Sequence, residues 1–113
     1  QEDISTIKDL SLNGNRVMVV DEKDTVKAFG VATGAILWEQ NDLRLRKLTS
    51  PVSIRSFVAV GDLEGYVHLL DAKSGDFLGR KKISRKPILE LTSERNFLLA
   101  VDESGKIFKL SLN

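Results

Sequence analysis

The sequence contains no cysteine, and only one histidine and one tryptophan occur among its 113 residues. Without cysteine, the chain has neither a disulfide framework nor a thiolate that could bind a metal or act as a nucleophile. The lone His68 has no second histidine with which to complete a metal site or an acid–base pair, so we expect it to have a structural role. No apolar run approaches the roughly 20 residues of a membrane-spanning helix, and nothing resembles a signal peptide.

The sequence also lacks an excess of charge of either sign. Lysine and arginine number 17 and aspartate and glutamate 16, which leaves a net charge of +1. Proteins that bind nucleic acid or membrane surfaces usually carry an excess of one sign over a whole domain, so this balance argues against both functions. The length and a hydrophobic content of 42% are sufficient for one globular domain with a core.

One pattern of strands and turns occurs three times in the chain. In residues 58–79, VAVGDLEGYVHLLDAKSGDFLG, it consists of a buried apolar strand, an acidic hairpin with Gly65, a second strand, and a turn that Gly75 closes. Residues 18–38 and 98–113 repeat this pattern. The alignment rests on two sets of equivalent residues: Val20, Val60 and Val101, and Thr25, Tyr66 and Lys106. The copies are therefore 40 or 41 residues apart, with a one-residue insertion placed in the middle hairpin.

Four short strands in about 40 residues is the period of a β-propeller blade. We therefore predict an all-β fold in which residues 1–113 form one propeller segment, with four-stranded antiparallel blades at 7–40 and 50–83 and an incomplete blade at 87–112. Because propellers have about 4 to 8 blades, about two and three-quarter blades cannot close a ring. We expect a larger propeller, in which a strand from the other end of the parent chain completes the last blade. The uncovered blade faces predict self-association of this piece.

Residues 28–38, AFGVATGAILW, resemble the repeat A-x-D-x-x-T-G-x-x-x-W of quinoprotein-type propellers. Thr33, Gly34 and Trp38 match this pattern, while Gly30 replaces its aspartate. Glycine permits the sharp turn between the outer strands, and the tryptophan can pack its large face against the adjoining blade.

The second copy of this repeat keeps the turn but loses the tryptophan. Asp71 and Gly75 remain, and we expect Asp71 to form hydrogen bonds within the turn rather than to belong to a catalytic triad. Gly79 stands where the tryptophan would be, so we predict that another residue, Phe77, docks this blade against the next.

The segment DLRLRKLTSPV at 42–52, together with residues 58–80, is similar to the C-terminal blades of the BamB family, the propeller lipoproteins of the outer-membrane β-barrel assembly machinery in Gram-negative bacteria. The resemblance implies an eight-bladed, non-enzymatic periplasmic scaffold without cofactor. It also implies an N-terminal lipid anchor, whose cysteine would lie upstream, and binding to the periplasmic POTRA domains of the central barrel component. Two alternatives stay open: a piece of a pyrroloquinoline-quinone dehydrogenase, for which no cofactor or calcium ligands are visible, and a generic peptide-binding propeller module.

In a four-stranded blade, the hairpin between the second and third strands and the connector to the next blade lie at the same end. That end collects acidic hairpin residues, namely Asp21, Glu22, Asp24, Asp62, Glu64, Asp102 and Glu103. They lack the D-x-D-x-D-G loop of a calcium site, and the alternative to a docking surface is that they are solvated turns. We predict partner binding by four connector residues: Leu43, Arg44, Leu45 and Arg46.

A second cluster of charge is basic and follows the outer strand of the middle blade. Its members are Arg80, Lys81, Lys82, Arg85 and Lys86. Such a run can contact an anionic partner or lipid headgroups, but on an edge strand it is more often a solvated face that prevents unwanted strand pairing.

Overall fold

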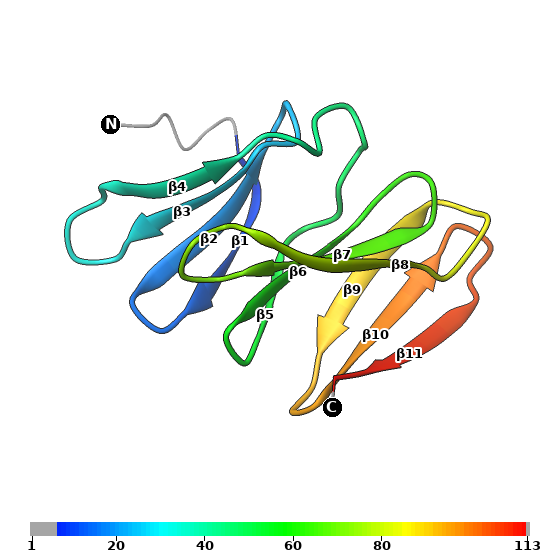
Figure 1. Cartoon of the computed structure of the whole chain (residues 1–113). Helices are drawn as coiled ribbons and strands as arrows, with labels where there is room; N and C mark the ends of the chain where they lie inside the picture. Colours follow the sequence, from blue (N-terminus) through cyan, green and yellow to red (C-terminus); the bar gives the residue numbers. More distant parts are fainter. Residues whose placement is uncertain (1–6, 113) are drawn as a thin grey trace.

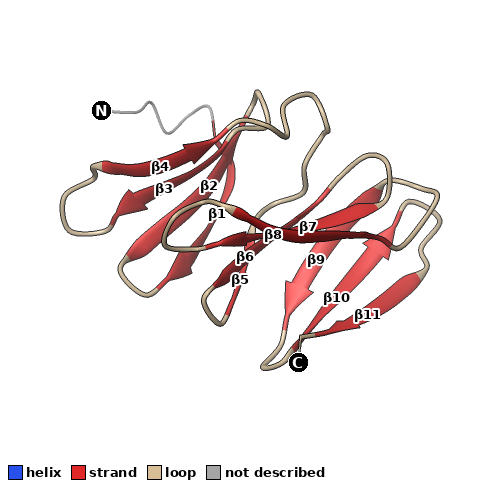
Figure 2. Ribbon diagram, in the orientation of Figure 1, coloured by secondary structure: helices blue, strands red, loops and turns tan. Residues whose placement is uncertain are grey.

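The computed structural model describes residues 7–112, in which all regular secondary structure is β strand (Figure 1; Figure 2). The first sheet contains β1 (Ile7–Asn13), β2 (Arg16–Asp21), β3 (Val26–Gly30) and β4 (Ile36–Gln40). The second contains β5 (Val52–Ile54), β6 (Phe57–Gly61), β7 (Tyr66–Asp71) and β8 (Phe77–Lys82). The third contains β9 (Ile88–Ser93), β10 (Phe97–Asp102) and β11 (Ile107–Ser111). The prediction of an all-β fold built from antiparallel propeller blades is confirmed.

The three sheets lie side by side in chain order (Figure 1), and their first strands are neighbours, since β5 contacts both β1 and β9. Hydrogen bonds between turns reinforce this contact. The Asn13 side-chain amide donates to the Arg55 carbonyl at 2.8 Å, and the Arg55 guanidinium donates to the Asn96 side chain at 2.5 Å. Innermost strands that meet in this way are the arrangement of blades around a propeller axis.

Each gap between neighbouring sheets holds a hydrophobic core. The middle sheet contributes to both cores because successive side chains of a strand point to opposite faces. Val58 and Val60 of β6 therefore pack toward the first sheet, while Ala59 between them packs toward the third. A strand that is buried on both faces explains the uninterrupted apolar run, and each fully buried valine or leucine stabilises the fold by about 1.5–3 kcal/mol.

The three hairpins have the same length, so the predicted insertion in the middle hairpin is wrong. In each hairpin the N–H of the first residue donates to the carbonyl of the last, over the ranges 21–25, 62–66 and 102–106. Strand pairing then makes Val20, Gly61 and Val101 equivalent, because they face Val26, Val67 and Ile107 respectively. The one-residue difference in spacing belongs to the connectors between sheets.

Gly61 differs from its valine counterparts because the third sheet approaches closely at this position. A Cβ atom on Gly61 would lie 2.5 Å from the Cγ2 atom of Ile88, whose side chain belongs to the second core. A valine here would therefore displace β9. The sequence alone predicts Val60 at this position, because a valine is the obvious match for Val20 and Val101.

Trp38 joins the first sheet to the outer turn of the second. Its ring lies against Gly75 at a separation that leaves no room for a Cβ atom, and its Nε1–H donates to the Ala72 carbonyl at 2.9 Å. The turn that receives it is held by Asp71, whose carbonyl accepts the Gly75 N–H and whose carboxylate accepts the Ser74 N–H.

The turn that leads into β4 is held by the same kinds of hydrogen bond. The Gly34 N–H donates to the Gly30 carbonyl at 2.8 Å, and the Thr33 hydroxyl accepts the Ala35 N–H at 3.1 Å. Gly34 has φ of 71°, a backbone conformation that glycine adopts without the steric cost of a side chain. The turn therefore sets the direction in which β4 returns and carries Trp38 toward the second sheet.

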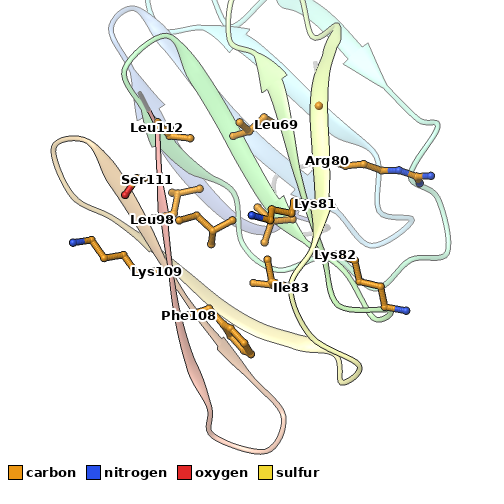
Figure 3. A pocket seen from close by; sticks show the side chains of 13 residues that line it. Leu69, Arg80, Lys81, Lys82, Ile83, Leu98, Phe108, Lys109, Ser111 and Leu112 are labelled. Atoms are coloured by element: carbon orange, nitrogen blue, oxygen red, sulfur yellow. The ribbon is translucent and has the colours of Figure 1, made fainter.

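Gly79 of β8 leaves a cleft between the second and third sheets (Figure 3). The cleft has a volume of about 710 Å³ and an apolar floor that includes Leu69, Leu98 and Phe108. Phe77 does not fill it, contrary to expectation, because its ring lies on the other side of β8, 6.4 Å from the ring of His68.

We predict that Gly61→Val destabilises the chain by about 1–3 kcal/mol, because the added side chain overlaps with Ile88. Urea unfolding monitored by circular dichroism measures the change. Gly79→Ala is the matched control, since a Cβ atom there meets no other atom within 4 Å, and it should leave stability within about 0.5 kcal/mol. Equal effects of the two substitutions would contradict the packing that we describe.

Candidate functional site

The connector between the first two sheets, residues 41–51, is the segment in which we predicted partner binding. It leaves β4 and crosses to β5 at the end of the molecule that carries the hairpin of the first sheet (Figure 1). Leu43 and Leu48 are buried in the first core, with 3% and 5% of their surface exposed. The connector is therefore fixed by two apolar anchors, and the residues between them form a loop.

Polar contacts hold this loop against the hairpins on both sides. The Asp24 carboxylate of the first hairpin accepts the N–H groups of Lys47 and Leu48 at 3.2 and 2.9 Å. On the other side, the Arg46 carbonyl accepts the Leu63 N–H at 2.8 Å, so the loop also follows the second hairpin. The shape of the loop thus depends on contacts with two sheets rather than on its own sequence.

Leu45 at the tip of the loop is unusual in two respects. Its side chain is 85% exposed, although it is a large apolar residue, and its φ of 66° lies in the left-handed region that side-chain-bearing residues rarely adopt. Lys47 nearby has φ of 52°. Such conformations cost of order 1–3 kcal/mol each and cluster at binding sites, where the surrounding structure maintains them.

The structure separates the four predicted contact residues into two pairs. Arg44 and Leu45 are exposed, whereas Leu43 is buried and is therefore an anchor of the loop rather than a surface contact. Arg46 is partly buried, and its guanidinium donates to the carboxylates of Asp62 at 3.2 Å and Glu64 at 3.3 Å. Of the four predicted contact residues, Arg44 and Leu45 are therefore available to a partner, whereas Leu43 and Arg46 hold the loop in position.

The acidic hairpin residues are not all solvated turns. Asp24, Asp62 and Asp102 are 5%, 0% and 2% exposed. Asp62 accepts the N–H groups of Glu64 and Tyr66 on one carboxylate oxygen, at 2.9 and 3.0 Å. Asp21 and Asp102 are the first residues of the other two hairpins, as Asp62 is of the second. Their carboxylates also accept the N–H groups two and four residues further along the chain: Asp21 from Lys23 and Thr25, and Asp102 from Ser104 and Lys106.

The second oxygen of each of these carboxylates binds a different partner. Asp62 contacts the His68 Nε2 atom at 2.7 Å. Asp21 pairs with the Lys27 ammonium at 3.4 Å, and Asp102 accepts the Ser84 hydroxyl at 2.7 Å. The histidine therefore has an acidic partner, which the absence of a second histidine does not indicate. The position that His68 shares with Lys27 is the feature of the sequence that points to it, because Lys27 pairs with the equivalent Asp21.

Hydrogen bonds keep these carboxylates ionised despite burial. Burial alone would raise the pKa of Asp62, but the bonds from His68 and from the Tyr66 and Glu64 N–H groups offset it, so the pKa is lowered. The pKa of Asp21 is lowered by the corresponding bonds, again against burial. The Ser104 and Ser84 hydroxyls are the main reason that the pKa of Asp102 falls to about 2.

Two further observations concern residues 7–112 alone. No three acidic, histidine or cysteine side chains in this range gather in a cluster that could hold a metal ion. No helix in this range is long and apolar enough to cross a membrane.

Consecutive four-stranded antiparallel sheets with adjacent first strands and tryptophan docking define a run of β-propeller blades of the quinoprotein type. A family model described as outer membrane protein assembly factor BamB matches residues 3–111. The chain belongs to the BamB family, as the sequence resemblance predicted.

Similar proteins include outer membrane protein assembly factor BamB of Escherichia coli K12, which is 37% identical over 83 residues, or 74% of this chain and 21% of that protein. The Salmonella typhimurium LT2 protein of the same name is 32% identical over 98% of this chain and 29% of its own length. The crystal structure of BamB from Moraxella catarrhalis superposes with a TM-score of 0.85 and 33% identity, over 91% of this chain and 30% of that one. The chain thus spans less than a third of these relatives.

The lowered carboxylate pKa values predict loss of stability in acid. The pKa of Asp102 is about 2 in the folded chain against an ordinary value of 3.8, so its contribution is complete above pH 3.8 and is lost as pH falls toward 2. Thermal unfolding between pH 5 and pH 2 should show a steep fall in Tm. Asp102→Asn should make the fall in Tm less steep, whereas Asp76→Asn, at an exposed position, should leave it unchanged. If the dependence of Tm on pH is the same in Asp102→Asn as in the parent chain, the Asp102 carboxylate is not a source of this acid sensitivity.

Proposed function

We propose that the chain is part of a non-enzymatic scaffold subunit of the machinery that inserts β-barrel proteins into the outer membrane of Gram-negative bacteria, on its periplasmic side. Membership of the BamB family supports this proposal, because the relatives are named outer membrane protein assembly factors. The family match gives no support to the quinone dehydrogenase or generic peptide-binding alternatives. The mechanism is binding: rigid stacked sheets present connector loops to a partner.

The partner that we propose is the set of periplasmic POTRA domains of the barrel component, which the sequence resemblance implies. The observation that supports a contact on this chain is Leu45, an exposed leucine in a strained conformation that contacts with two hairpins maintain. An exposed apolar side chain next to an exposed arginine in the sequence, Arg44, has the composition of an interface hot spot, where arginine and apolar anchors dominate. The surrounding charges of both signs suit a polar rim.

We predict that Leu45→Ala or Arg44→Ala weakens binding of purified POTRA domains about tenfold, because each truncation removes an anchor at the contact. Isothermal titration calorimetry with this chain and with a longer protein that contains it measures the change. Leu89→Ala is the matched control, since Leu89 is 59% exposed on β9, away from the connector. Equal binding of all three variants would show that the contact lies elsewhere on the propeller.

Binding by the longer protein alone would assign these blades a supporting role within the ring. If neither protein binds, the quinone alternative is tested next. Pyrroloquinoline quinone added with calcium should raise the unfolding temperature of a dehydrogenase propeller and leave that of a scaffold unchanged.

We also propose that the chain self-associates when it is separated from its parent. The first and third sheets and the turn before β4 expose large apolar side chains, namely Leu10, Leu12, Val31, Ile36, Leu37, Leu89 and Ile107. Light scattering over a hundredfold range of concentration should show a mass that increases with concentration. A constant monomer mass would contradict this prediction.

A further inference from the structure

The fourth residue of each hairpin has a left-handed backbone conformation. In the three hairpins this residue is Asp24, Gly65 and Gly105, with φ of 63°, 89° and 86°. In each case its N–H donates to the carbonyl of the first hairpin residue, at 3.0, 3.3 and 2.9 Å. The three hairpins therefore share one backbone design, and the first has an aspartate where the other two have glycine, the residue that adopts this conformation without steric cost.

The Asp24 side chain reaches out of its hairpin to the connector. It is 5% exposed, and its two carboxylate oxygens accept different N–H groups: Oδ2 accepts that of Lys47 at 3.2 Å and Oδ1 that of Leu48 at 2.9 Å. These N–H groups lie on either side of the Cα atom of Lys47, which has φ of 52°, and both point to the same carboxylate. Successive N–H groups that converge in this way form a binding site for an anion, and the first hairpin supplies that anion.

The second hairpin holds its own connector without a side chain. The connector at 83–87 passes so close to Gly65 that a Cβ atom there would overlap with the Ser84 carbonyl, and the Gly65 carbonyl accepts the Ile83 N–H at 2.9 Å. The connector at 41–51 is longer, and the Asp24 carboxylate attaches it to the first hairpin instead. An aspartate at the glycine position thus makes two bonds that a glycine could not make.

The segment that Asp24 holds adjoins the exposed tip of the loop. Leu48 is buried in the first core, whereas Leu45, three residues earlier, is 85% exposed with φ of 66°. Arg46 is bound to the second hairpin, where its carbonyl accepts the Leu63 N–H at 2.8 Å. The tip therefore lies between a backbone bond to one hairpin and a carboxylate of the other. Because Asp24 is buried, it acts on the tip only through the backbone that it holds.

We propose that Asp24 is a positioning residue of the connector, and that its carboxylate maintains the loop conformation in which Arg44 and Leu45 are presented to a partner. The inference rests on the proposed function, since it names the residue that prepares this contact for binding. A loop held in advance has fewer conformations to lose when the partner binds. The left-handed conformation of Asp24 carries a steric cost that the glycines of the other hairpins avoid, and the two bonds to the connector offset it.

Amide hydrogen exchange followed by NMR tests this role in the chain itself. Asp24→Gly removes the carboxylate and gives the first hairpin the residue of the other two. We expect the Lys47 and Leu48 amides to exchange at least about tenfold faster, because each loses a bond to an ionised acceptor. The amides of β2 and β3 should remain protected, which confirms that the first sheet is folded. Exchange of both connector amides within about twofold of the parent chain overturns the inference.

Asp24→Asn separates the hydrogen bonds from the size of the side chain. Asparagine tolerates the left-handed conformation but has one acceptor oxygen, so one of the two connector amides should keep its protection while the other loses it. If both amides exchange as slowly as in the parent chain, the two carboxylate bonds do not hold the connector and the inference fails.

Arg55→Gly is the matched control for the change to glycine. Arg55 has φ of 55° in the turn between β5 and β6, at the other end of the second sheet from its hairpin. This variant should leave exchange of the Lys47 and Leu48 amides within about twofold of the parent chain. Equal acceleration in Arg55→Gly and Asp24→Gly would show a general loosening of the chain, and would overturn the inference.

Binding of the POTRA domains separates this inference from the proposed function. Asp24→Gly should weaken binding about threefold or more, although Asp24 is buried, because the loop must then be ordered by the partner. Equal binding by this variant and the parent chain overturns the inference while the proposed function stands. If neither the parent chain nor a longer protein that contains it binds the domains, the proposed function fails and with it the presentation of Leu45, whereas hydrogen exchange still decides whether Asp24 holds the connector.

Discussion

The carboxylate at the start of each hairpin is the interaction on which the functional end of the molecule depends. One oxygen satisfies two turn N–H groups, and the other reaches Lys27, His68 or Ser84 outside the turn. A buried carboxylate would be costly without these bonds, and with them it fixes the hairpin to its surroundings. Since Arg46 pairs with one of these carboxylates, the position of the connector also depends on it.

Close contacts at glycine set the distance between neighbouring sheets. Trp38 lies on Gly75, Ile88 approaches Gly61, and the carbonyl of Ser84 occupies the space where Gly65 would carry a Cβ atom. The first two contacts bring the neighbouring sheet to within packing distance of the backbone, and the third does the same for the segment that follows β8; a side chain at any of these glycines would prevent this approach. Gly79 stands where the corresponding tryptophan would be, and a cleft remains between the second and third sheets.

Two kinds of contact hold the connector in place. Buried leucines and hydrogen bonds to two hairpins hold a loop whose tip, Leu45, is neither buried nor relaxed. A loop that is already held in one conformation loses little conformational entropy when it binds, so less of the binding free energy is spent on ordering it.

Most of the architecture was predictable from the sequence alone, because strands and turns follow from local patterns. The apolar runs, the glycines of the turns and the 40-residue period specify four-stranded blades and their order, and they also indicate the connector as the exposed segment. Which side chains of the connector are exposed was decided only by tertiary structure. Leu43 and Leu45 look equivalent in DLRLR, but a backbone that turns through left-handed φ values sends one into the core and the other to solvent. The pairing of His68 with Asp62 likewise depends on the geometry of a hairpin, since residues on its two arms meet only after the strands have paired.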